Sequence, residues 1–121
     1  MKIKIISKQI FEDYEDKFEE IYDKSNIKFI DKNIIINYNG NEIVYDKEKN
    51  SIEIIREENN IFVKLNNECE SVYETPYGKF SMKTFGEKIL IEEKPFKIII
   101  EYKIFIENMK EYRNIIEILE V

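Results

Sequence analysis

The sequence predicts an all-β protein with a single domain, residues 1–121, built as one closed or nearly closed antiparallel barrel of about 8–10 strands. Short runs of alternating apolar and polar residues recur about every ten residues along the chain. Tight-turn sequences such as Asn39-Gly40 separate them, and no segment has the pattern of the crossover helix that a parallel sheet needs. A closed barrel is favoured because closure leaves no exposed strand edge.

The first part of the chain contains one clear strand and one ambiguous segment. Residues 2–10 alternate isoleucine with lysine, which is typical of a half-buried strand. In residues 11–22, four aromatic or apolar residues recur at helical spacing, but the segment runs on into the strand-like residues 27–30. We favour a strand from about residue 17, and a short helix near residues 11–22 stays open as the alternative.

The rest of the chain reads as strands joined by turns. Thr75-Pro76-Tyr77-Gly78 fits a type I turn, with proline at the second position and glycine at the fourth. A turn is also expected around Gly86. The longest strand places Phe96, Ile98, Ile100, Tyr102, Ile104 and Ile106 on one face. The predicted strands are residues 34–38, 42–45, 52–57, 61–65, 69–74, 79–85, 88–92, 96–107 and 112–121.

Composition excludes several classes of function. The net charge of −6, with charges of both signs interspersed, argues against nucleic acid as a partner, since phosphate binding needs a clustered basic face. No apolar run approaches the roughly 18–20 residues that span a bilayer, and the N-terminus lacks a signal-peptide pattern. We therefore expect no membrane association and a cytoplasmic location.

Catalysis and metal binding also find little support. The chain has no histidine, so neither a Ser-His-Asp nor a Cys-His catalytic group can form within it, and zinc loses its usual ligands. Cys69, the single cysteine, lies between two glutamates, a setting that does not favour a reactive thiolate. No spacing among the many carboxylates selects an acid and a nucleophile. We expect no enzyme activity, no catalytic residues, no metal and no cofactor.

The order of these elements resembles a known family. An opening Lys-Ile-Lys-Ile strand, an Ile-Ile-Arg strand, the Tyr-Glu-Thr-Pro-Tyr-Gly-Lys-Phe segment at residues 73–80 and a final Ile-Leu-Glu-Val are similar to the YwiB-like proteins. This family of uncharacterised bacterial proteins has a calycin-like, lipocalin-type β-barrel. The resemblance implies that barrel and a bacterial cytoplasmic setting, but no catalytic residues. Residues 12–19 are more acidic than the family pattern.

Arg56 is the leading candidate for a ligand-binding residue. It shares its predicted strand face with Ile52 and Ile54, so strict alternation aims it at the interior, where a guanidinium needs a partner such as a carboxylate. Alternatively, it lies at the end of the strand and extends to water. The resemblance adds that calycin-type barrels holding fatty acids grip the ligand head group with such an arginine and a tyrosine.

Three tyrosines complete the candidate site. Tyr38 and Tyr102 are expected to face Arg56 or to line the interior, and Tyr77 to cover the barrel mouth or to form a contact patch. The aromatic residues Phe62, Phe80, Phe85, Phe96 and Phe105 either fill the barrel or line a ligand cavity. The leading hypothesis is a non-catalytic binder of a small apolar or carboxylate-bearing molecule. The alternative is a structural or protein-interaction module with a solid core and an unknown partner.

Overall fold

The computed structural model describes residues 1–56 and 59–121, and every regular element in them is a β-strand. No helix long and apolar enough to cross a membrane occurs in these two ranges. The strands are β1 (Ile3–Ile10), β2 (Glu15–Tyr22), β3 (Ser25–Ile30), β4 (Asn33–Tyr38), β5 (Asn41–Asp46), β6 (Ser51–Ile55), β7 (Asn60–Lys64), β8 (Glu68–Thr75), β9 (Gly78–Glu93), β10 (Phe96–Ile106) and β11 (Tyr112–Glu120). The all-β prediction is therefore confirmed.

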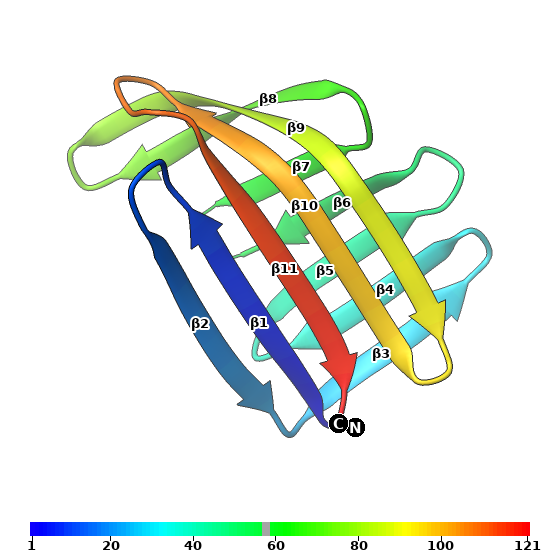
Figure 1. Cartoon of the computed structure of the whole chain (residues 1–121). Coiled ribbons are helices and arrows are strands. Elements are labelled where there is room, and N and C mark those ends of the chain that lie inside the picture. Colours follow the sequence, from blue (N-terminus) through cyan, green and yellow to red (C-terminus); the bar gives the residue numbers. More distant parts are fainter. Residues whose placement is uncertain (57–58) are drawn as a thin grey trace.

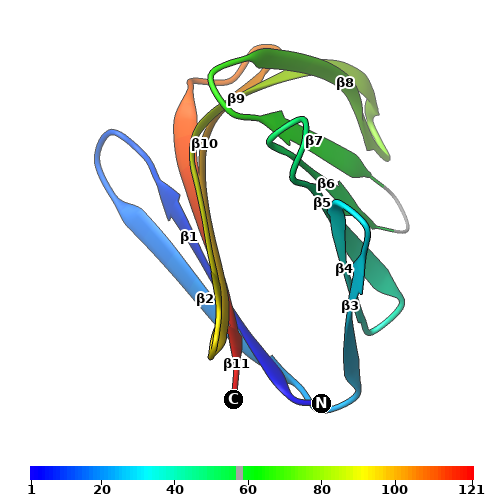
Figure 2. The same cartoon turned by 90° about the vertical axis from the view of Figure 1, so that its right-hand side faces the viewer.

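The strands form two sheets (Figure 1). One has six strands in the order β2-β1-β11-β10-β9-β8, and the other has five in the order β3-β4-β5-β6-β7. All paired strands are antiparallel. In Figure 1 the strands of the five-stranded sheet run across those of the six-stranded sheet, and in Figure 2 the two sheets face each other with β8 and β9 curling over the top.

The expected closed barrel is wrong, although the strands keep the order of one. Within each sheet, strands that follow one another in sequence pair with each other, and β11 pairs with β1, as in an up-and-down barrel. Pairing stops at two seams, between β2 and β3 and between β7 and β8, so the six-stranded sheet remains an open, curled half-barrel. Charged side chains along β2, including Glu19 and Glu20, protect its free edge from further pairing.

Residues 11–22 contain a strand and not a helix. The whole of β2 pairs in register with β1, from Ile3 opposite Tyr22 to Ile10 opposite Glu15. The apolar residues at helical spacing do not mark a buried helix face, because nearly every residue of β2 is exposed. The strand that we favoured is confirmed, and it begins at Glu15, slightly earlier than expected.

The turn predicted at Gly86 is also wrong, because β9 continues through it as one strand. Gly86 lies opposite Tyr102 and Lys88 opposite Glu101, so Glu87 is an extra residue in a β-bulge. A Cβ on Gly86 would lie 2.5 Å from the backbone oxygen of Lys64. Glycine is needed here for the close approach of two backbones, and not for a reversal of the chain.

Two predicted turns agree with the structure. Asn39 and Gly40 both have positive φ, 45° and 78°, as a type I′ hairpin requires. Thr75 ends β8 and Gly78 begins β9, which leaves a two-residue loop between them. The Thr75 hydroxyl oxygen accepts a hydrogen bond from the Tyr77 amide at 3.1 Å, and the hydroxyl donates to the Gly78 carbonyl oxygen at 3.1 Å. This corner is structural.

Isoleucine fills the space between the two sheets. The inward face of β10 is buried along its full length, as its alternation predicts. Of the phenylalanines expected inside, Phe96 is buried, but Phe62 and Phe105 are 42% and 36% exposed and lie outside the core. The side chains that are no more than 2% exposed are Ile3, Ile34, Ile36, Ile43, Ile52, Ile54, Val63, Met82, Ile98, Ile100, Tyr102 and Ile118, together with the hydroxyl-bearing Thr84.

One end of the five-stranded sheet is tied down by backbone hydrogen bonds between turns. We call this the pinned end; it lies on the right in Figure 1. Three backbone amides donate hydrogen bonds to backbone carbonyl oxygens there. The distances are 2.8 Å from Lys47 to Lys32, 3.0 Å from Leu65 to Asn50 and 2.8 Å from Asn66 to Gly86. A bridge between Leu65 and Gly86 joins the two sheets there.

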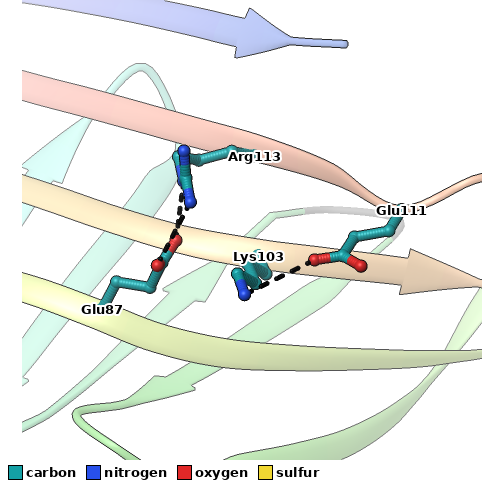
Figure 3. Close-up of polar contacts among 4 residues, drawn as sticks. All are labelled: Glu87, Lys103, Glu111 and Arg113. Carbon is teal, nitrogen blue, oxygen red and sulfur yellow. Dashed lines mark hydrogen bonds and ion pairs between the residues drawn. The ribbon is translucent and has the colours of Figure 1, made fainter. Parts of the chain in front are cut away.

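The outer face of the six-stranded sheet carries ion pairs (Figure 3). The Arg113 Nε lies 2.7 Å from a carboxylate oxygen of Glu87, and the Arg113 Nη2 lies 3.3 Å from the other. The Lys103 Nζ lies 3.8 Å from the Glu111 Oε1. The bulge at Glu87 aims its carboxylate across β10 toward Arg113 on β11.

Candidate functional site

The opposite end of the five-stranded sheet, which we call the hollow end, contains two cavities. Four residues mark it: Tyr38 ends β4, Asn41 begins β5, Arg56 follows β6 and Asn59 precedes β7. They lie at the same end because consecutive antiparallel strands reverse direction at each turn. All four line a cavity.

The first cavity has a volume of about 270 Å³ and is open to solvent. It contains both a cation, Arg56, and an anion, Glu20. Phe18, on its rim, is more than half exposed. Its walls come from β1, β2, the β4–β5 hairpin and the residue after β6, and consist of Ile5, Ser7, Phe18, Glu20, Tyr22, Tyr38, Asn41 and Arg56.

The second cavity is smaller, about 220 Å³, and more enclosed. Its lining combines apolar side chains of β9, β10 and β11 with polar ones from several elements. Ser7 and Arg56 line both cavities, so the two adjoin at these residues. The full lining is Ser7, Gln9, Arg56, Asn59, Ile61, Met82, Tyr102, Ile104, Ile106, Tyr112, Asn114 and Ile116.

Arg56 occupies the position between the cavities. It lies one residue beyond β6, where its amide donates to the carbonyl oxygen of Asn59 at 3.2 Å, and its side chain is exposed. Arg56 thus meets both sequence-based descriptions, since it reaches water at the end of the strand and also lines the interior. It lies near Tyr38, where its positive charge acts to lower the pKa of the tyrosine hydroxyl against the effect of burial. A solvent-accessible guanidinium beside an apolar interior suits the head group of an anion.

Two tyrosine rings pack against each other beside Arg56 in the first cavity, tilted by 56°. The rings of Tyr22 and Tyr38 lie 4.9 Å apart, and the Tyr22 hydroxyl donates to Glu20. Burial, followed by the hydrogen bond to Glu20, raises the pKa of Tyr22 to about 12. Burial also raises the pKa of Tyr38, while the charge of Arg56 acts in the opposite direction. Both hydroxyls therefore stay protonated at neutral pH.

The second cavity contains a buried polar pair. The Asn114 Nδ2 donates to the Tyr102 hydroxyl oxygen at 3.0 Å. The Asn114 Oδ1 is buried without a hydrogen-bond partner in the described part of the chain. Burial raises the pKa of Tyr102, with Asn114 and the charge of Arg56 opposing that shift. A buried polar atom without a partner costs about 1–3 kcal/mol, so this pair is unfavourable for stability alone.

The structure brings together three of the four residues expected to bind a ligand. Tyr38 joins Arg56 in the first cavity, and Tyr102 joins it in the second. Tyr77 lies instead at the tip of the β8–β9 hairpin, where it is 93% exposed and lines neither cavity. It does not cover the interior, because the two-residue loop directs it outward.

Sequence reasoning did not identify several polar residues of the site. Asn114 is the most informative, because it shares its strand face with Ile116 and Ile118. A polar residue on an otherwise apolar face of β11 was a signal that could have been used. Ser7 and Gln9 are likewise polar residues on the face of β1 that carries Ile3 and Ile5. Asn59 lies in a connection and carries no such periodic signal.

The two cavities contain few chemically reactive side chains among the described residues. Glu20 is the one acidic residue among the described side chains that line the two cavities, so no carboxylate pair for acid–base chemistry is present there. The described residues contain no group of three or more histidine, cysteine or acidic side chains placed to hold a metal. What remains is one cation, several hydroxyls and amides, and an apolar wall.

Comparison with known proteins yields one structural likeness. No family model and no curated protein sequence matches the chain. The fold is similar to the crystal structure of the YwiB protein from Bacillus subtilis, with a TM-score of 0.49 and 16% sequence identity, over 98% of this chain and 89% of that one. This is the family that the sequence resembles, at a level that does not show membership.

Proposed function

We propose that this protein is a non-catalytic binder of a small molecule with a carboxylate or similar anionic head, held at the hollow end. The position of Arg56 in the wall of both cavities carries the proposal. An anion in either cavity meets the guanidinium, and the Tyr38 hydroxyl lies beside it as a second hydrogen-bonding group. The apolar residues of β10 and β11 receive the rest of the molecule.

Each cavity by itself suits a small ligand. Pockets for drug-sized ligands occupy about 300–1,000 Å³, and the two cavities have about 270 and 220 Å³. A short carboxylic acid therefore matches the space of the second cavity.

Replacement of Arg56 tests the proposal. Native mass spectrometry of the purified protein should show a retained small-molecule mass, and calorimetric titration should show binding of hexanoate. Arg56→Ala should weaken hexanoate binding about tenfold or more, because it removes a charge-assisted hydrogen bond.

Arg113→Ala is the matched control, since Arg113 is the other arginine of the sequence and lies on the outer face, paired with Glu87. It should bind hexanoate like the wild type. A bare mass together with no binding of short carboxylates by the wild-type protein would refute the proposal. Equal losses in the two variants would show that the site does not depend on Arg56.

A protein-interaction module is the second candidate, favoured by the free edge of β3. Phe29 and Ile30 on this strand are at least half exposed, and an unpaired apolar edge is a place where another strand can add. If this function is correct, sedimentation should show association of the wild type that Phe29→Glu abolishes. A monomer at all concentrations, bound to no other chain, would argue against it.

A further inference from the structure

The polar pair in the second cavity has unused hydrogen-bonding capacity directed at an empty space. Asn114 is only 8% exposed, yet its Oδ1 has no partner in the described part of the chain. The Tyr102 oxygen accepts from Asn114 at 3.0 Å, which leaves the Tyr102 hydrogen available for a second bond. Both residues line the second cavity, so a group placed there can use both.

A hydroxyl group matches this pair better than an ammonium or a carboxylate group does. It donates one hydrogen bond and accepts others, so it can donate to the Asn114 Oδ1 and accept from the Tyr102 hydroxyl at once. An ammonium group donates but cannot accept. It would also lack a counter-charge, because no acidic side chain is among the described residues that line this cavity. A carboxylate accepts but cannot donate to the Asn114 Oδ1.

We infer that the ligand is a short hydroxy acid, with its carboxylate at Arg56 and its hydroxyl between Tyr102 and Asn114. Arg56, Tyr102 and Asn114 line one cavity of about 220 Å³, so one small molecule can reach all three. The inference rests on the proposed function and specifies its ligand class. It also explains why a costly polar pair stands on a face that is mostly apolar: the ligand completes the hydrogen bonds of the pair.

Matched pairs of short acids test this inference. Calorimetric titration of the wild-type protein with butanoate, pentanoate and hexanoate is compared with titration by the ω-hydroxy derivative of each. At the length that spans the cavity, the hydroxy acid should bind about tenfold more tightly, since a site with buried polar groups discriminates against a ligand that leaves them unpaired. Equal affinities in every pair would overturn the inference and leave the proposed function standing.

Two variants assign the preference to the polar pair. Asn114→Leu and Tyr102→Phe each remove one partner and should bring the hydroxy acid and the plain acid to within about twofold of each other. Arg113→Ala, on the outer face, should keep the full preference. A preference that survives in both Asn114→Leu and Tyr102→Phe would overturn the placement of the hydroxyl. If neither member of any pair binds the wild-type protein, the inference and the proposed function both fail.

Discussion

The two ends of the five-stranded sheet differ in what holds them. At the pinned end, backbone amides donate hydrogen bonds to carbonyl oxygens of neighbouring turns, and the bridge between Leu65 and Gly86 joins the sheet to β9. At the hollow end, Tyr38, Asn41, Arg56 and Asn59 border open space and present their side chains to β1, β2, β10 and β11. The fold is fastened at one end of these strands, and the candidate site lies at the other.

Strand length accounts for this difference. Strands of five or six residues, at about 3.3 Å per residue, extend roughly 17–20 Å. The six strands that they cross are spaced about 4.8 Å apart and span about 24 Å. A strand of five or six residues is therefore shorter than the width of the sheet that it crosses. The two cavities lie at the hollow end of these short strands.

The same long strands serve both regions. On β10, Ile98 and Ile100 pack in the dry interior, whereas Tyr102, Ile104 and Ile106 line the second cavity. The fold thus places stabilising and cavity-lining residues on one rigid element, which positions side chains more accurately than a loop does.

The largest contrast is expected between two isoleucines of β10. Ile100→Ala should lower the free energy of unfolding by about 2–5 kcal/mol, because Ile100 is fully buried and its removal leaves a new void. Ile106→Ala should cost clearly less, because Ile106 already borders the second cavity. Urea denaturation measures both values. Equal losses would mean that the space beside Ile106 is packed like the rest of the core.

A glycine at each end gives the next contrast. Gly86→Ala should cost about 1–3 kcal/mol, because the new methyl group would overlap the Lys64 backbone. Gly40→Asn, in the hairpin at the hollow end, should cost less than about 1 kcal/mol, since nothing lies within 4 Å and asparagine tolerates its positive φ. Thermal and urea unfolding test this pair, and a Gly86→Ala protein as stable as the wild type would contradict the description of the pinned end.

Alkaline pH should weaken the hollow end. Tyr22 keeps its proton up to a pKa of about 12 in the folded protein, against the ordinary value of 10.0 in the unfolded chain. Its stabilising effect is therefore complete below pH 10 and is lost as the pH rises toward about 12. Tyr38 and Tyr102 shift in the same direction.

Urea titrations at increasing pH should show this loss, and Tyr22→Phe should make it smaller. Tyr14→Phe is a suitable control, since that tyrosine is exposed outside both cavities. A loss of stability that is unchanged in Tyr22→Phe would show that other groups cause it.

The smallest effect is expected on the outer face. Arg113→Ala breaks the ion pair with Glu87 but should change the free energy of unfolding by only about 0.2–1 kcal/mol, because both side chains are partly in water. Urea denaturation at low and high salt checks this value. A loss of several kcal/mol would mean that the Glu87 bulge depends on the pair for its geometry.

Local pattern was sufficient to predict most of the strands. The alternation from Phe96 to Ile106 and the Asn39-Gly40 turn depend on nearest neighbours in the chain, and both agree with the structure. The open barrel could not be predicted, because closure depends on which distant strand edges pair. The period of a strand contains no information about its partner. Gly86 was taken for a turn for the same reason, since the Lys64 backbone that requires it is distant in sequence.

The candidate site was predictable in part. Arg56 stood out because it is one of two arginines and shares a face with isoleucines, and Tyr38 and Tyr102 lie on inward faces of regular strands. Asn114 carried the same kind of signal on β11. Tyr77 misled because its residue type suggests binding, whereas its place at the tip of a tight hairpin directs it to solvent.

The separation of the two ends also bears on how the proposed site can change in evolution. Asn41 and Arg56 border the first cavity and make none of the backbone ties of the pinned end. Substitutions at these two positions change the groups that border the cavity without breaking those ties. If the proposed function is correct, the choice of ligand can change before the chain gains a reserve of stability.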